Sequence, residues 1–336
     1  WYVPRRTLGF GQRASQGSGF FVAPNPPFGA VFTYYLKDSI QTRKEKRQEK
    51  EKRIAKKGGD TPTPGWDALR AEQLEEKPAI MLTVRNSAGN AVRHLVGPPK
   101  KGIHRVSWSL TYPRTDPWSP PREREERRFS TRNPDDGVLV APGTYTVHLA
   151  KRREGKWTDL GKSQTFKVVP LRDGGTIPGM TPEEYAEFVR DYAAVMRSVG
   201  GVRSVLRDTA DRLKAIRQTL DRSTVSDPKL GEQVRDMERR IAAMRETLEG
   251  SRQRSEASDP GPVSINRRLN VVRGSVGSTL HGPTAMHREA YSIAKRQVVG
   301  LKKELDQLVE TELPDLERRL DESGVPWTPG RNIPGD

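Results

Sequence analysis

Two adjacent acidic pairs, Asp135-Asp136 and Glu183-Glu184, come closest in this chain to an acid and base arrangement. A glycosidase needs two carboxyl groups held about 5 to 10 Å apart across a sugar cleft. The first pair lies in a stretch that is typical of a loop. The second pair opens a helical pattern, where acidic side chains stabilise the N-terminus. We therefore expect neither pair to be catalytic.

The histidines do not show the spacing of a metal site. The sequence has no H-E-x-x-H or similar ligand pattern, and the histidines on expected strands are separated by whole elements. Surface or strand-edge positions are the better interpretation, with His104 on the outside of its strand. The five residues are His94, His104, His148, His281 and His287. No catalytic, cofactor-binding or metal-binding residue is assigned, and no cofactor is expected.

Motifs for nucleophilic and phosphate chemistry are also missing. Neither G-x-S-x-G nor G-x-x-x-x-G-K-[ST] occurs. Gly9-Phe10-Gly11 and Gly58-Gly59 are predicted to be turns, because they lack the strand-to-helix context that those motifs require. The absence of cysteine excludes disulfides, thiol nucleophiles and Cys-ligated metals. Neither hydrolase chemistry nor nucleotide binding is indicated.

The charge balance is strongly basic, with a formal net charge of +16 and a pI near 10.1. The densest block runs from Lys37 to Lys57, where ten basic residues stand against four acidic ones. A nucleic-acid surface would carry stacking aromatic residues among the basic ones, and the stretch 42–57 has none. Nucleic acid is therefore not an expected partner. A solvated charged face is favoured, and binding of an anionic polymer or membrane surface is the alternative.

The length of 336 residues and the 33% of hydrophobic residues favour two domains with small cores. The sequence has no apolar run long enough to span a bilayer and no apolar signal-peptide core. It begins at Trp1 without a methionine. We therefore expect a soluble, N-terminally truncated chain in which residues 1–20 are a linker from an upstream domain.

Residues 21–170 form the first expected domain, built from strands. Alternating apolar residues predict strands at 30–37 and 101–113 and a hairpin at 79–97 that turns between Asn86 and Asn90. Residues 138–170 predict two more strands and a turn, which Pro142-Gly143 makes. Alternation places Trp108 at the centre of the core.

Two segments interrupt this pattern. Residues 37–78 predict a charged helical insertion, with helices at 42–57 and 66–77. Residues 114–136 are rich in proline and charge and predict a long loop.

The period of the apolar residues changes from two to 3.6 at Thr181, after a linker at 171–180. Thr181-Pro182-Glu183-Glu184 predicts a capping box, and Asp227-Pro228 predicts the start of another helix. Residues 181–324 are expected to form an antiparallel helical bundle, followed by a tail at 325–336. Gly200-Gly201 could kink or split the first helix, so that one long helix or two follow Thr181. Ser251 to Gly261 is expected to be a polar linker, and the last helix should be interrupted near Pro314.

Four stretches together resemble a known arrangement: APNPPFGAVFTYYLKD at 23–38, SAGNAVRHL at 87–95, RVSWSL at 105–110 and APGTYTVHL at 141–149. They are similar to the region that follows the propeller in bacterial secreted proteins with BNR or sortilin-like repeats, which are often called glycosyl-hydrolase-like. The strand region also resembles flagellar hook-cap domains, and GVPWTPGR at 324–331 agrees. No S-x-D-x-G-x-T-W blade motif occurs, so a propeller-borne activity would lie outside this chain.

The resemblance implies an α+β multidomain chain, with an Ig-like antiparallel β-sandwich followed by the helical bundle. It implies a non-catalytic structural or interaction region of an extracellular or periplasmic protein, packed on the propeller of the same parent chain. Another protein or a glycan could also be a partner. An accessory carbohydrate-binding role, through Trp66, Trp118 or Trp157, is the alternative from a different class.

Overall fold

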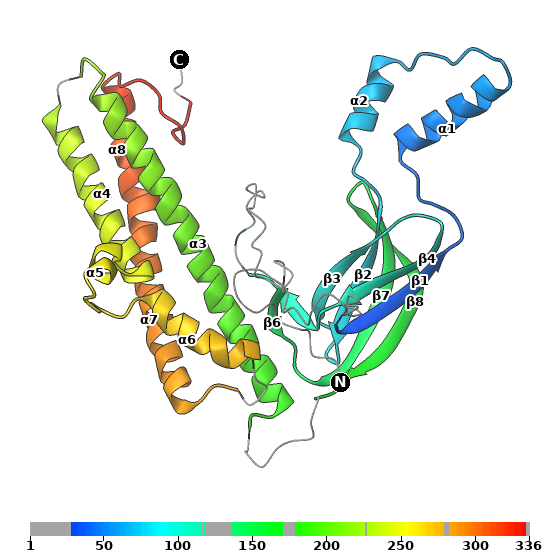
Figure 1. The fold of residues 1–336 in the computed structure, drawn as a ribbon. Coiled ribbons are helices and arrows are strands. Elements are labelled where there is room, and N and C mark those ends of the chain that lie inside the picture. Colours follow the sequence, from blue (N-terminus) through cyan, green and yellow to red (C-terminus); the bar gives the residue numbers. More distant parts are fainter. Residues whose placement is uncertain are drawn as a thin grey trace, which may run out of the picture. The chain divides into compact units, whose positions relative to one another are not determined.

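The computed structural model describes residues 28–115, 117, 136–170, 179–225, 227–278 and 282–333. They divide into two compact units, a strand unit over 28–114 and 136–170 and a helix unit from 179 to 333 (Figure 1). The expected mixture of helices and antiparallel sheets is confirmed at this coarse level. The expected linker at 1–20, Asn25-Pro26-Pro27 and most of the expected loop at 114–136 lie outside the described residues.

The strand unit contains three antiparallel sheets, and its predicted hairpin at 79–97 is confirmed. The two strands predicted within 138–170 are also confirmed, as a long hairpin that turns at Glu154-Gly155. The sheets are β1 (Ala30–Leu36) with β4 (Gly102–Trp108), β5 (Thr111–Pro113) with β6 (Asp136–Leu139), and a four-stranded sheet in the order β3 (Ala91–Gly97), β2 (Ala79–Asn86), β7 (Gly143–Arg153) and β8 (Lys156–Val168).

One apolar core joins the β1–β4 pair to the four-stranded sheet, and Trp108 is fully buried in it as predicted. The Trp108 ring meets Tyr145 edge-on at 5.6 Å between centroids and Phe166 at 6.1 Å. Burial of each large apolar side chain contributes about 1.5 to 3 kcal/mol. The fully enclosed members are Tyr34, Ile80, Leu82, Val84, Val92, Trp108, Val140, Tyr145 and Val147.

Two buried tyrosines close this core with their hydroxyl groups. Tyr145 Oη donates to the carbonyl oxygen of Ala141 at 2.7 Å, four residues upstream, and Tyr34 Oη donates to Pro98 at 2.7 Å. Burial raises the pKa of Tyr34 to about 12, and it raises the pKa of Tyr145 as well. Both phenols therefore remain protonated donors throughout the physiological range.

The strand predicted over 101–113 is shorter than expected. Leu110 has a left-handed φ of 57°, which ends β4 at Trp108 and sends residues 111–113 into the pair with β6. The expectation that His104 lies outside is wrong, because strand alternation puts it on the side of Trp108, where its ring lies 5.3 Å from that of Tyr34. Ile103 is the residue that faces outward instead.

The insertion forms two helices, α1 (Arg43–Lys56) and α2 (Trp66–Leu74). Thr42 and Glu45 form a capping box at the start of α1, and Gly58 ends it with a positive φ. Arg47 pairs bidentately with Glu72 of α2 at 2.6 and 2.8 Å. Three ion pairs then tie the insertion to the β7–β8 hairpin: Arg43–Glu154, Arg152–Glu76 and Arg153–Glu75.

The helix unit begins with the predicted capping box, in which Glu184 N–H donates to Thr181 Oγ1 and the Thr181 N–H to Glu184. The predicted start at Asp227 is also confirmed. The elements are α3 (Pro182–Leu220), α4 (Pro228–Glu249), α5 (Arg252–Glu256), α6 (Ile265–Ser278), α7 (Ala285–Gln307), the π-helical turn η1 (Leu308–Glu312) and α8 (Leu313–Glu322).

Of the two alternatives left open at Gly200-Gly201, one helix or two, the structure has one: α3 continues for 39 residues, because its buried stripe on both sides of the pair holds it in place. The expectation of a linker without helix between Ser251 and Gly261 is wrong, because this stretch contains α5, which the Ser251 side chain caps. The expected interruption near Pro314 is confirmed as the π turn that precedes it.

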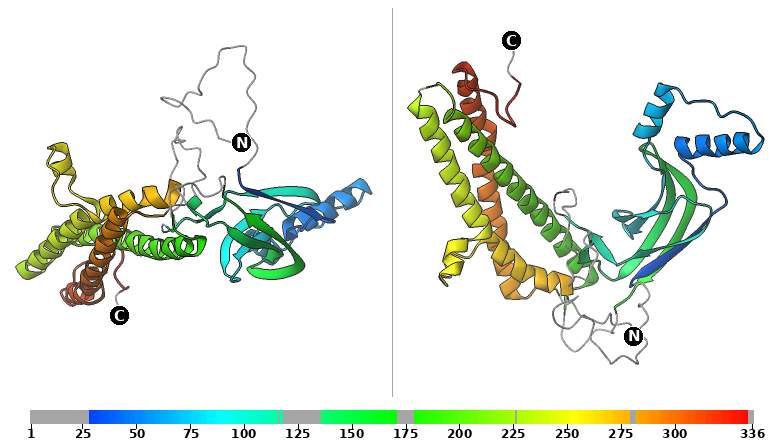
Figure 2. Two further views of the ribbon diagram at one scale, coloured as in Figure 1. Left: turned by 90° about the horizontal axis from the view of Figure 1, so that it is seen from below. Right: turned by 45° about the horizontal axis from the view of Figure 1, so that its top comes forward.

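Long helices α3, α4 and α7 lie side by side (Figure 2). The apolar stripe predicted for α4 is buried at each position from Leu230 to Leu248. Tyr185 Oη of α3 donates to the carbonyl of Val276 in α6 at 2.7 Å, so the first turn of α3 is fastened to α6. None of the described helices is long and apolar enough to cross a membrane.

Residues after α8 fold back on the helices, although a tail was expected from 325 on. Gly324 ends α8 in a Schellman turn, with Val325 N–H donating to Leu320 at 3.0 Å. The buried Arg331 guanidinium then pairs with Asp321 and donates to the carbonyl of Pro326 at 2.9 Å.

We predict that Tyr145→Phe destabilises the strand unit by about 1 to 2 kcal/mol, because the buried carbonyl of Ala141 loses its donor. Tyr35→Phe is the matched control, because Tyr35 lies on the exposed side of β1. Its effect should stay within about 0.5 kcal/mol. Amide hydrogen exchange in β2 and β7, followed at increasing urea concentration, gives the change in the free energy of unfolding for each variant. Equal effects of the two variants would contradict this role for the hydroxyl group.

Candidate functional site

The face of the four-stranded sheet that points away from the core, here called the outer face, carries aromatic and polar side chains. Figure 1 shows the strands of this sheet. Register places one polar residue of each strand in a single row across the sheet, because Thr83 pairs with His94 on one side and His148 on the other, and His148 pairs with Ser163. We call these four residues the polar row: His94, Thr83, His148 and Ser163.

A contact between His94 and Trp157 crosses the outer face. The two rings lie 5.2 Å apart between centroids at 76°, in an edge-to-face arrangement. His94 belongs to β3 and Trp157 to β8, which are the edge strands, so their side chains together reach over both central strands. Met81 and Thr83 of β2 are buried although they point to this face. Trp157 itself keeps 46% of its surface exposed.

Hydrogen bonding and electrostatics fix the state of His94. Its Nδ1 lies 3.0 Å from Thr83 Oγ1, which leaves Nε2 as the ring nitrogen directed elsewhere. Burial, and secondarily the charge of Arg85, lower the pKa of His94 below its ordinary value. The imidazole is therefore neutral at physiological pH and can donate or accept one further hydrogen bond.

Two arginines at the border of this face have partners of their own. The Arg152 guanidinium lies 2.8 Å from Glu76, and Arg85 donates to the carbonyl of Gly89 at 2.8 Å. The polar row contains no carboxylate, ammonium or guanidinium group. The arrangement thus offers an exposed indole, a neutral imidazole and hydroxyl groups, a set suited to binding.

Other residues that the sequence suggested are placed elsewhere. Trp66 of α2 is 85% exposed and carries no aromatic contact in the described residues, and Trp118 lies outside them. Asp135 also lies outside the described residues. Asp136 accepts hydrogen bonds from Ser109 at 2.8 Å and Thr111 at 3.0 Å, so it fastens β5 and β6 to the core.

The remaining acidic pair and histidines have structural contacts. Glu184 belongs to the capping box of α3, with Glu183 beside it in the first turn. His104 Nε2 donates to the carbonyl of Lys100 at 2.6 Å, and His287 completes a cap with Thr284 at the start of α7. His281 lies outside the described residues.

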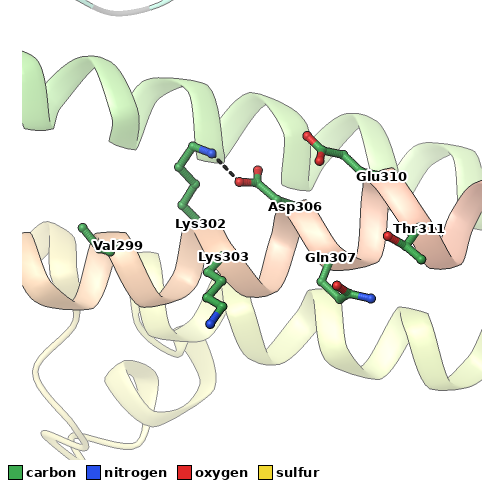
Figure 3. Close-up of a pocket in the computed structure, with 7 residues that line it drawn as sticks. All are labelled: Val299, Lys302, Lys303, Asp306, Gln307, Glu310 and Thr311. Carbon is green, nitrogen blue, oxygen red and sulfur yellow. Dashed lines mark hydrogen bonds and ion pairs between the residues drawn. The ribbon is translucent and has the colours of Figure 1, made fainter.

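A shallow hollow on the helix unit runs along one side of α7 and η1 (Figure 3). Lys302 is paired there with Asp306, and this hydrogen bond raises the pKa of the ammonium group. The seven lining residues come from consecutive turns of the same helix, so the hollow is an open helix surface. They are Val299, Lys302, Lys303, Asp306, Gln307, Glu310 and Thr311.

Within the described part of the chain, no three histidine, aspartate or glutamate side chains are grouped to hold a metal ion. No family model, curated protein or solved structure matches the sequence or the fold. The outer face, with its contact between His94 and Trp157, is therefore the arrangement on which a function is argued.

We predict that acidification weakens the strand unit through His94. Because the folded state lowers the pKa of His94, the unfolded chain binds the proton more readily. The stabilisation that neutral His94 gives to the folded state is complete above the pKa of histidine in the unfolded chain, about 6.5. It is lost as the pH falls from there toward the lower pKa that His94 has in the folded state. His94→Gln should reduce the fall in melting temperature between pH 7.5 and pH 5.

The matched variant His148→Gln, from the same polar row, should retain the full fall in melting temperature. The measurement is the melting temperature of the parent and of both variants between pH 7.5 and pH 5. A His94→Gln protein with the pH dependence of the parent would contradict the assignment.

Proposed function

We propose that this chain is a non-catalytic structural and interaction region of an exported, extracellular or periplasmic protein. The strand unit, an Ig-like β-sandwich, packs on a β-propeller that precedes it in the parent chain. The helix unit, an antiparallel α-helical bundle, provides a scaffold or a partner surface. The resemblance to the region after sortilin-like propellers supports the location and the partner.

The hydrogen bond from Tyr145 supports the Ig-like interpretation. In Ig-like sandwiches a tyrosine near the start of a strand donates its hydroxyl to backbone a few residues upstream, which closes the corner between two strands. Tyr145 does this to Ala141 at the start of β7. The stacking of β1 and β4 against the other sheet through one core agrees with such a sandwich.

An exposed apolar surface on the β1–β4 pair carries the proposal of packing. Val31 is 47% exposed, Tyr35 64% and Ile103 72%, and Tyr35 lies directly opposite Ile103 in the strand register. All three point away from the core on the same face. A cluster of this kind marks an interaction surface. Because β1 is the first strand of the described residues, the chain that leads to an upstream domain joins the strand unit at this pair.

The test begins with the coding sequence upstream of Trp1, which should encode four-stranded blades. The propeller, produced as a separate polypeptide, should bind this chain. Tyr35→Ser with Ile103→Ser should weaken binding at least tenfold, because each buried apolar side chain contributes more than about 1.4 kcal/mol. Isothermal titration measures the dissociation constants.

Trp66→Ser is the matched control, since Trp66 is more exposed than any of the three residues and lies on α2. It should leave the binding constant unchanged. An upstream sequence without blades, or equal binding by the double variant and the parent, would overturn the proposal.

A second candidate function is binding to an anionic surface, and the exposed face of α1 favours it. Lys46 and Lys50 lie about 40° apart around α1, since successive residues turn by about 100°, and Lys57 directly follows its last turn. All three are exposed and enter no ion pair among the described residues. Arg47, about 60° from Lys50 around the helix, holds a neighbouring face against α2.

For this candidate we predict binding to phosphatidylserine vesicles that declines steeply between 50 and 300 mM salt. Replacing Lys46, Lys50 and Lys57 with Gln should weaken binding about a hundredfold, because each lysine at an anionic membrane contributes about 1 kcal/mol. The control replaces Lys214, Lys229 and Lys303, which removes the same charge from the helix unit. Co-sedimentation measures the bound fraction, and equal losses in both variants would reject a role for α1.

A further inference from the structure

We propose that the outer face of the four-stranded sheet binds a neutral polysaccharide, with one sugar ring stacked on Trp157 and neighbouring hydroxyl groups bound by the polar row. This binding site is separate from the proposed packing surface, which lies on the β1–β4 pair. The two proposals can therefore fail independently.

The exposed part of the Trp157 indole supplies a stacking surface. Nearly half of this large side chain faces solvent, while the edge-to-face contact with His94 holds it over the sheet. An aromatic face carries partial negative charge, and the C–H bonds on the face of a pyranose carry partial positive charge. A ring already held in place loses little conformational entropy when a ligand binds.

The polar row matches a chain of sugars in spacing and in chemistry. Adjacent strands lie about 4.8 Å apart, which is close to the repeat of about 5 Å along a β-1,4-linked pyranose chain. His94 offers Nε2, because Nδ1 already contacts Thr83. His148 and Ser163 continue the row to the edge strand β8. Sugar hydroxyls can thus meet a donor or acceptor on β3, β7 and β8, while the buried Thr83 of β2 holds His94 in place.

The charge of the site favours a neutral ligand. A nucleic acid or an acidic polymer would require lysine or arginine side chains available to its anionic groups. Arg152 is paired with Glu76, Arg85 donates to the carbonyl of Gly89, and Asp159 on β8 adds a carboxylate. Lys167, opposite Thr144, lies on the same face four positions from Ser163. The polar row itself carries no charge, so a neutral hydroxyl-rich polymer meets no charge penalty along it.

The open form of the face favours a polymer over a small molecule. Small-molecule sites enclose most of their ligand in a pocket. The polar row instead runs from one edge strand to the other, so a chain can enter and leave at both ends. Such a surface binds several sugar units weakly and gains affinity from their number.

Affinity gel electrophoresis of the whole chain provides the test, with β-glucan, xylan, mannan, amylose and chitin oligosaccharides as separate probes. We expect retardation by one or more of them, and titration of the matching oligosaccharide should show saturation. Trp157→Ala should weaken binding at least tenfold, and Ser163→Ala about threefold. Trp157→Phe should retain part of the affinity, because it keeps an aromatic ring.

Trp66→Ala is the matched control, and it should bind as the parent does. Circular dichroism and hydrogen exchange in β2 establish that each variant is folded, and Ser163→Ala tests the site if Trp157→Ala does not fold. The proposal is overturned if none of the neutral probes binds, or if Trp157→Ala binds as tightly as the parent. Equal losses in Trp157→Ala and Trp66→Ala would also overturn it.

Discussion

The burial of Trp108 is the packing contact on which the strand unit depends. Its ring meets Tyr145 and Phe166, and its indole N–H donates to the carbonyl of Thr111 at 3.0 Å. The backbone next to Trp108 is also closely packed. A Cβ on Gly29 would lie 1.9 Å from the carbonyl oxygen of Trp108, so only glycine fits at this position. Because side chains alternate along a strand, enclosing this one ring determines which side chains of β1, β4 and β7 point outward.

Two outward faces of different chemistry follow from that alternation. The β1–β4 pair presents Val31, Tyr35 and Ile103, which suit a protein partner, while the other sheet presents Trp157 and the polar row. The helix unit is built differently. Its apolar stripes form its own core. Its surface carries exposed ion pairs, each of which contributes about 1 kcal/mol or less.

The features that the sequence predicted well are local ones. A capping box depends on residues three positions apart, and a hairpin depends on its turn, so Thr181, Asp227 and the 79–97 hairpin were accessible from the sequence alone. The contact between His94 and Trp157 was not. Alternation assigns each residue to a face, but the order of strands, which makes β3 and β8 the two edges, depends on packing between distant segments.

The errors have the same origin. Leu110 adopts a backbone conformation that a leucine seldom takes, because burial of Trp108 and pairing with β6 outweigh its local preference. The fold of residues 325–333 depends on Arg331 reaching Asp321 ten positions earlier. No periodic pattern marks either interaction.

The π turn at Leu308–Glu312 corrects the phase of the last helix. Buried leucines recur at 301, 305 and 308, and then the next one comes five residues later at Leu313. In a regular α-helix that step would rotate Leu313 about 140° away from Leu308, out of the core. The wider turn, closed by the Leu313 N–H on Leu308, absorbs the additional residue. One continuous rod can therefore join two apolar repeats that are out of step by a single amino acid.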